Sequence, residues 1–207
     1  MDGVITDTMP YHLRAWISVL AAEGVKVNHR DIYKREGQKG IDSVREIFAE
    51  KRVKYTDTVG KRILQKKEEL FKKIFKRKFI AGSRGFIKSS KALGFRLALV
   101  TGTSRTEAQK LLPLDLWNCF EVTVCGCDVQ SGKPHPEPYL KALNKLNIGP
   151  ADALVFENAP FGISSAHAAG IRCLALETSL PRAFLNEADA VFPSFKALRS
   201  KVTFIKT

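Results

Sequence analysis

Polar side chains that could bind and transfer a phosphoryl group occur in four short segments of the chain. They are Asp2, Thr101, Lys133 and the adjacent pair Glu157-Asn158. Phosphate monoesters react extremely slowly in water, so a catalyst must neutralise the phosphoryl oxygens and hold a nucleophile in place. A hydroxyl and an ammonium group can neutralise those oxygens, and carboxylate oxygens are ligands that Mg²⁺ prefers. The four segments together predict one phosphate and magnesium site.

The apolar runs that precede these groups are typical of strands in a parallel sheet. We expect strands at 95–100, 121–124, 153–156, 171–176 and 190–192, and helices at 105–112, 136–146 and 161–169. Apolar strands that alternate with helices predict a sheet covered on both faces. Ligands of such sheets bind beyond the carboxyl ends of the strands. Thr101, Lys133 and Glu157 each follow a separate predicted strand and are therefore expected at that edge.

Residues 9 to about 80 have a helical pattern throughout. We expect helices at 10–23, 30–35, 42–51 and 61–78, the last of which is rich in lysine and arginine. Apolar residues recur in this basic helix at three- and four-residue spacing, so its lysines are expected on a solvated face. A positive field that attracts anionic substrates is a second interpretation, and nucleic-acid binding is a third. The sequence has no helix-turn-helix or zinc-finger signature, so we expect no nucleic-acid partner.

The composition is typical of a soluble globular protein. The chain has 207 residues, of which 44% are hydrophobic and 27% charged, with a formal net charge of +13. It contains neither an apolar run long enough to cross a bilayer nor a secretory signal. We therefore expect a cytoplasmic protein with no membrane partner and no obligate protein partner.

The run Cys125-Gly126-Cys127 could bind a metal or be redox-active, but its place at the end of an alternating segment favours reduced, buried cysteine.

The polar segments, in this order, resemble the motifs of the haloacid dehalogenase-like (HAD) phosphotransferases, in particular the beta-phosphoglucomutase-like phosphatases and mutases. The run Asp2-Gly3-Val4-Ile5-Thr6-Asp7-Thr8 matches their first motif, Asp-x-Asp-Gly-Val-x-x-Asp-Thr, from its second aspartate onward. The resemblance implies an α/β fold with a Rossmann-like parallel-sheet core at 1–10 and 81–207. It also implies an inserted all-helical cap at 11–80. The first strand and the first aspartate of the motif would precede Met1, so we expect the chain to be truncated at its N-terminus.

The resemblance implies a role for each motif residue. Asp2 would act as general acid and base and would help to bind Mg²⁺ through its backbone carbonyl. Thr101 would hydrogen-bond the phosphate, and Lys133 would neutralise it. Glu157 and Asn158 would complete the magnesium site, with an amide at Asn158 where an acid often stands. Structural alternatives remain: Lys133 could be a surface lysine, Thr101 could cap a helix, and Glu157 could simply pair with Lys133.

Substrate contacts are expected from the start of the cap, from a glycine-containing cap loop and from the loop after the first predicted strand. The candidate residues are His12, Gly37, Gln38, Lys39, Thr103 and Ser104. His12 could equally pack or cap its own helix, and Asp7 and Thr8 are expected to fix the hinge to the cap. Beta-phosphoglucomutases carry an arginine shortly after the cap glycine that grips a distal phosphate. This chain lacks that arginine, which favours a phosphatase over a mutase.

The expected activity of the full-length protein is magnesium-dependent hydrolysis of a small phosphorylated metabolite, a sugar phosphate being the favoured class. By resemblance the reaction would pass through an aspartyl phosphate, and the chain as it stands would be inactive because it lacks the nucleophilic aspartate. Two alternatives remain open. One is a sugar-phosphate mutase of the beta-phosphoglucomutase type, and the other is a non-catalytic homologue that retains the fold.

Overall fold

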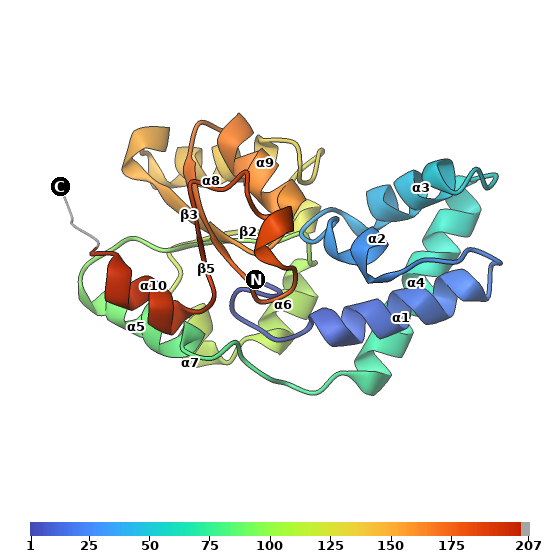
Figure 1. Cartoon of the computed structure of the whole chain (residues 1–207), viewed down its shortest axis with the longest axis horizontal. Helices are drawn as coiled ribbons and strands as arrows, with labels where there is room; N and C mark the ends of the chain where they lie inside the picture. The colour runs from blue at the N-terminus through green and yellow to red at the C-terminus, as the bar shows by residue number, and fades with distance from the viewer. Residues whose placement is uncertain (204–207) are drawn as a thin grey trace.

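The computed structural model describes residues 1–203 and divides into a helical part and an α/β part (Figure 1). The helical part consists of α1 (Met9–Ala21), α2 (His29–Tyr33), α3 (Gly40–Glu50) and α4 (Asp57–Ile74). These helices enclose a hydrophobic cluster of their own, which includes Trp16, Leu20, Ile47, Phe48 and Ile63. A separate cluster of this kind is what an inserted cap needs. The cap boundary at 11–80 stays a prediction that this cluster supports.

The α/β part follows after a turn at Gly82, whose φ of +83° an L-residue side chain would disfavour. Its helices are α5 (Ser83–Ala92), α6 (Arg105–Leu111), α7 (Leu114–Trp117), α8 (Glu137–Leu146), α9 (Pro160–Ala168) and α10 (Phe195–Lys201). Its strands are β1 (Ala98–Val100), β2 (Val122–Val124), β3 (Leu154–Glu157), β4 (Arg172–Leu176) and β5 (Ala190–Phe192). Short 3-10 turns occur at η1 (Gly126–Asp128), η2 (Pro150–Asp152) and η3 (Arg182–Phe184). The predicted alternation of strands and helices is confirmed.

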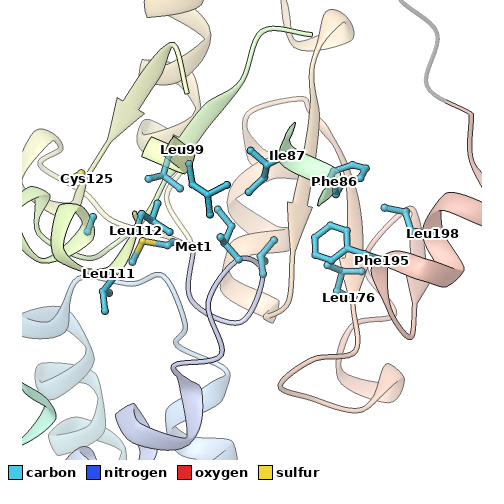
Figure 2. Packing of buried hydrophobic residues seen from close by; sticks show 14 of the residues in the cluster. Met1, Phe86, Ile87, Leu99, Leu111, Leu112, Cys125, Leu176, Phe195 and Leu198 are labelled. Carbon is cyan, nitrogen blue, oxygen red and sulfur yellow. The ribbon is translucent and has the colours of Figure 1, made fainter. Parts of the chain in front are cut away.

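All five strands are paired in parallel, but they form two sheets instead of the single sheet expected. β1 pairs with β2, and β3, β4 and β5 form the second sheet in that order. The first residues form a tight turn, in which the amides of Val4, Ile5 and Thr6 all donate to the carbonyl of Met1. The side chains of Met1, Val4 and Ile5 pack into a cluster that takes residues from both sheets, among them Leu99 and Leu176 (Figure 2). This apolar cluster joins the two sheets.

The predicted elements differ from the observed ones mainly at their ends. The basic helix begins at Asp57, capped by the Thr56 hydroxyl, which accepts from the Val59 amide at 3.3 Å. It ends at Ile74 because Phe75 is extended, so residues 76–78 lie outside the helix instead of within it. Helices α5, α7 and α10 were not predicted. α7 is four residues long and covers too few turns to reveal a helical period. α5 and α10 are as long as α8 and α6, at ten and seven residues, and were not recognised.

Two further expectations concern the cysteines and the membrane. Cys125 and Cys173 are buried free thiols, as expected, but Cys127 is exposed. The strand-like alternation does not reach Cys127, because it lies in the η1 turn after β2. No helix within residues 1–203 is long and apolar enough to span a bilayer.

Candidate active site

Asp2, which is buried, is the centre of a small hydrogen-bonded group of side chains. The hydroxyl of Thr8 donates to its Oδ1 at 2.5 Å, and the hydroxyl of Thr103 donates to its Oδ2 at 3.1 Å. The Nε2 atom of His12 lies 3.5 Å from Oδ1. The three partners come from the first turn, from α1 and from the loop after β1. Thr8 was expected only at the hinge, so its bond to Asp2 extends its role.

These contacts decide the charge of Asp2. Burial raises the pKa of the Asp2 carboxyl, but the hydrogen bond and positive charge of His12, the charge of the N-terminal ammonium group and the Thr8 hydrogen bond outweigh it and leave the pKa below its ordinary value. Burial, aided by the positive charge of Lys67, lowers the pKa of His12. The His12 ring is stacked on Phe71, with centroids 4.1 Å apart. Asp2 is therefore ionised at neutral pH, and a neutral His12 can still donate one hydrogen bond to it.

Thr101 follows β1 directly and lies beside this group. Its backbone amide donates to the Val124 carbonyl at 2.9 Å, which continues the β1–β2 pairing. Its hydroxyl oxygen accepts from the Thr103 amide at 3.2 Å, so its own proton is available to another acceptor. The helix cap proposed as an alternative belongs to Ser104, whose hydroxyl accepts from the Glu107 amide at 3.4 Å at the start of α6.

Lys133 and Glu157 form a buried ion pair. The Lys133 Nζ atom lies 2.5 Å from Glu157 Oε1, and the two side chains are 3% and 6% exposed. The Tyr139 hydroxyl donates to the same oxygen at 2.6 Å. Burial raises the pKa of Glu157, but the charge of Lys133 outweighs it and the net shift is downward. Lys133 is thus no surface lysine, and the pairing named as the structural alternative for Glu157 is present.

Of the expected magnesium ligands, Glu157 and Asn158 are adjacent at the end of β3, and Asn158 lies against Gly3, the residue after Asp2. The Asn158 amide nitrogen donates to Ser179 Oγ at 2.9 Å, while its Oδ1 is buried without a hydrogen-bond partner. A β-carbon added to Gly3, the neighbour of Asp2, would lie 2.1 Å from the Asn158 amide nitrogen. Residues 1–203 contain no group of three His, Cys, Asp or Glu side chains that could hold a metal. The unpartnered oxygen of Asn158 is a hard donor of the kind that Mg²⁺ prefers.

A cavity of about 140 Å³ lies between the helical part and the ends of the strands. It is lined from the α/β side by Asp2, Thr101, Gly102, Thr103, Ser104, Glu107 and Leu111. From the helical side it is lined by Met9, His12, Trp16, Ile32, Arg35, Glu36, Gly37, Gln38, Gly40, Ser43, Ile47, Leu64, Lys67, Glu68 and Phe71. The cavity therefore joins the predicted catalytic residues Asp2 and Thr101 to the predicted cap residues.

The two parts of the chain are in direct contact over this cavity. A β-carbon added to Gly102 would lie 2.5 Å from the Gly37 carbonyl oxygen, and one added to Gly37 would lie 2.8 Å from Lys133 Cδ. The ammonium group of Lys39 donates to the carbonyl oxygens of Val129 and Gln130 at 2.7 and 2.9 Å. Lys39 therefore fastens the cap loop to the α/β part and does not line the cavity, unlike the other predicted cap residues.

Lys67 is a charged cavity residue that the sequence analysis placed elsewhere. Lys67 was expected on the solvated face of the basic helix, but it is half-buried and lines the cavity, with its ammonium group 5.3 Å from the ring centroids of Trp16 and Phe71. Its spacing of four residues from both Ile63 and Phe71, which are buried, was the available signal. Glu36 is also buried here. It belongs to the cap loop at 35–43 from which substrate contacts were expected.

Comparison with known proteins identifies the family. The model of the haloacid dehalogenase-like hydrolases matches residues 1–176. The chain belongs to this family. Phosphatases and phosphoglucomutases of the haloacid dehalogenase-like family generally use a divalent metal.

Related haloacid dehalogenase-like proteins are named as phosphatases and as a mutase. A phosphorylated carbohydrates phosphatase of Thermotoga maritima is 34% identical over 175 residues, which are 83% of this chain and 79% of the relative. The beta-phosphoglucomutase of Bacillus subtilis is 28% identical over 180 residues, 83% of this chain and 78% of the relative. A solved structure from Bacteroides vulgatus, provisionally assigned as a beta-phosphoglucomutase, is 32% identical with a TM-score of 0.87, covering 97% of this chain and 84% of that one. The predicted family, fold class and enzyme class are therefore confirmed.

Proposed function

We propose that this site hydrolyses the phosphate ester of a small phosphorylated carbohydrate. The proposal rests on one observation: the ionised Asp2, Thr101 and Thr103 together line one wall of the cavity between the strand ends and the helices. The relationship to the phosphorylated carbohydrates phosphatase supports the substrate class. In this proposal the phosphoryl group lies at Asp2 and Thr101, and the carbon skeleton extends toward the helices.

The proposed reaction assigns the nucleophile to the first aspartate of the motif, two positions before Asp2 in the full-length protein. Its carboxylate would take the phosphoryl group from the substrate, and water would then release phosphate from the aspartyl phosphate. A bound phosphoryl group brings negative charge next to Asp2 and raises the pKa of its carboxyl, because like charges disfavour ionisation. Asp2 can then hold the proton that the leaving oxygen needs, and once ionised it can accept a proton from the attacking water.

The remaining residues bind and orient the phosphoryl group. The Thr101 hydroxyl has a free proton to donate to a phosphoryl oxygen, and Lys133 supplies positive charge behind the Gly37 loop. We propose Mg²⁺ as the divalent metal, held by Asp2 and the unpartnered oxygen of Asn158 with Glu157 nearby. Bound there, it would neutralise charge that develops on the phosphoryl oxygens. We also propose that residues 11–80 move as a cap, because the two parts approach closely beside the cavity, where Gly37 lies against Gly102.

A mutase is the second candidate, and the match to the structure assigned as a beta-phosphoglucomutase favours it. A phosphatase releases inorganic phosphate from a sugar phosphate, whereas a mutase converts glucose 1-phosphate to glucose 6-phosphate without net release. The two products are measured in one reaction mixture by phosphate detection and by chromatography. The proposal predicts release.

The test compares residues 1–207 with a version extended upstream through the first motif aspartate, both assayed with Mg²⁺ on a panel of phosphorylated carbohydrates. The extended protein is expected to release phosphate, and its Asp2→Asn variant is expected to lose at least 100-fold in kcat, in line with the roughly 10²–10⁴-fold effect of general acid–base catalysis. Full turnover by residues 1–207 would refute the assignment of the nucleophile. Binding of sugar phosphate without turnover by either protein would identify a non-catalytic homologue.

A further inference from the structure

The helical wall of the cavity contains a buried carboxyl oxygen that has no hydrogen-bond partner. Glu36 is 9% exposed, lines the cavity, and its Oε2 atom is unpartnered. Within residues 1–203 two other buried side-chain atoms share this property, the hydroxyl of Tyr55 and Oδ1 of Asn158, and neither residue lines the cavity. A buried unpaired oxygen destabilises a fold. A ligand that hydrogen-bonds to it removes that penalty.

The polar side chains next to Glu36 are already occupied. The Arg35 guanidinium donates to Glu46 Oε2 at 3.2 Å and to the Asp31 carbonyl at 2.6 Å. The Gln38 amide donates to Glu46 Oε1 at 2.6 Å and accepts from the Ser43 hydroxyl at 2.9 Å. These bonds hold the cap loop rigid without using Glu36. The neighbours of Glu36 therefore fix the loop that carries it, but none of them donates a hydrogen bond to its Oε2 atom.

The charges around Glu36 define the chemistry of its missing partner. Burial raises the pKa of the Glu36 carboxyl well above its ordinary value, and the negative charges of Asp2 and Glu157 add to this, while Lys133 opposes it. In its ionised form this carboxyl would repel a further anionic group, most strongly at the low dielectric of the cavity wall. A hydroxyl group both donates and accepts, so it can satisfy the carboxyl in either protonation state. The partner that fits is thus a neutral hydroxyl.

We propose that Glu36 is a specificity-determining residue that hydrogen-bonds a hydroxyl on the carbon skeleton of a monophosphorylated carbohydrate and disfavours a second phosphate at that end. This inference rests on the proposed function, which places the phosphoryl group at Asp2 and Thr101 on the opposite wall of the same cavity. Lys67 lines the same cavity, with its ammonium group 5.3 Å from the ring centroids of Trp16 and Phe71. Selection against a second phosphate would make the site specific for sugar monophosphates over sugar bisphosphates.

The test measures binding to residues 1–207 by isothermal titration calorimetry, with inorganic phosphate, glucose 1-phosphate and glucose 1,6-bisphosphate as probes. The wild-type protein is expected to bind glucose 1-phosphate more tightly than either of the other two. Glu36→Leu is expected to weaken glucose 1-phosphate binding about 10-fold, as the loss of one such hydrogen bond implies, and to leave phosphate binding within about twofold. Glu36→Gln keeps the hydrogen-bonding capacity but cannot ionise, so in alkaline buffer, where Glu36 ionises, it should bind the bisphosphate more tightly than wild type, and the difference should shrink as the pH falls. Glu69→Gln, an equal charge change on the exposed side of α4, is the control and should alter none of these affinities.

The outcomes separate this inference from the function on which it rests. Wild-type binding of phosphate with no gain for glucose 1-phosphate, or equal gains in wild type and Glu36→Leu, would overturn the role of Glu36 and leave the phosphate site standing. Absence of phosphate binding in wild type would overturn the proposed function itself. If Glu36→Leu does not fold by circular dichroism, the bisphosphate-to-monophosphate ratio in Glu36→Gln decides, and an unchanged ratio would refute the proposal.

Discussion

Removal of the buried charge of Lys133 should destabilise the protein strongly. In Lys133→Met the carboxylate of Glu157, 5% exposed, would lose its ion-pair partner at 2.5 Å and keep only the Tyr139 hydroxyl and the Asn158 amide as donors. Breaking a buried pair by removing one partner costs roughly 3–5 kcal/mol of unfolding free energy. With a urea dependence of about 2 kcal/mol per M, the unfolding midpoint should fall by about 1.5–2.5 M.

The assay is urea unfolding at pH 7, followed by fluorescence, for wild type, Lys133→Met, Glu157→Gln and the double variant. The double variant should recover most of the loss, because it leaves no unpaired buried charge, which gives a coupling energy of about 2 kcal/mol or more. Lys88→Met is the matched control. Its pair with Asp115 is also short, at 2.7 Å, but the two side chains are 51% and 46% exposed, so the loss should stay below about 1 kcal/mol.

The pH dependence gives an independent check of the same pair. The pKa of Glu157 in the folded protein is below its ordinary value of 4.5, so its stabilising contribution is complete above that value and is lost as the pH falls through the folded pKa. The stability gap between wild type and Lys133→Met should therefore shrink in acid. Equal losses for Lys133→Met and Lys88→Met, additive effects in the double variant, or a gap that widens in acid would each refute the reasoning.

Three further predictions follow from the packing of the cavity and the cysteines. Gly102→Ala places a methyl group 2.5 Å from the Gly37 carbonyl oxygen, so it should keep the cap from closing and lower the affinity for phosphate about 10-fold or more, measured by calorimetry; unchanged affinity would contradict the closed contact. Glu36→Leu removes an unpaired buried oxygen and should raise the free energy of unfolding by about 1–3 kcal/mol, measured in urea; a loss would show that Glu36 has a partner. Cys127 is exposed whereas burial raises the pKa of Cys125 to about 11, so one thiol reagent at pH 7 should modify Cys127 first and Cys125 only on unfolding, as peptide mapping would show; early labelling of Cys125 would be contrary evidence.

The sequence predicted the strands and the edge at which the polar residues meet. Apolar runs before Thr101, Lys133 and Glu157 gave the strand ends directly, since parallel strands place their carboxyl ends at one edge. It could not predict that these residues divide between two environments. Asp2 and Thr101 line the cavity, whereas Lys133 and Glu157 are paired behind it, and this division depends on the turn of the first residues and the position of the Gly37 loop.

The helical residues of the site were harder to predict for a different reason. Lys67 is a charged side chain whose residue type favours exposure, so its type alone predicts that it lies in solvent. Its partial burial follows from the docking of the helices on the strand ends, a tertiary contact that its four-residue spacing from Ile63 and Phe71 indicates only weakly. The strands form two sheets because residues 1–8, which pack in the apolar cluster that joins the sheets, form a turn and not a strand.

The most direct measurement of the central claim is a crystal structure of residues 1–207 grown with tungstate, an anomalous scatterer that mimics phosphate. We predict an anomalous peak within hydrogen-bond distance of the Thr101 hydroxyl, in the cavity lined by Asp2 and Thr103. Tungstate bound only at the basic surface around Lys72 and Arg77, with the cavity empty, would contradict the assignment of this cavity as the phosphoryl site.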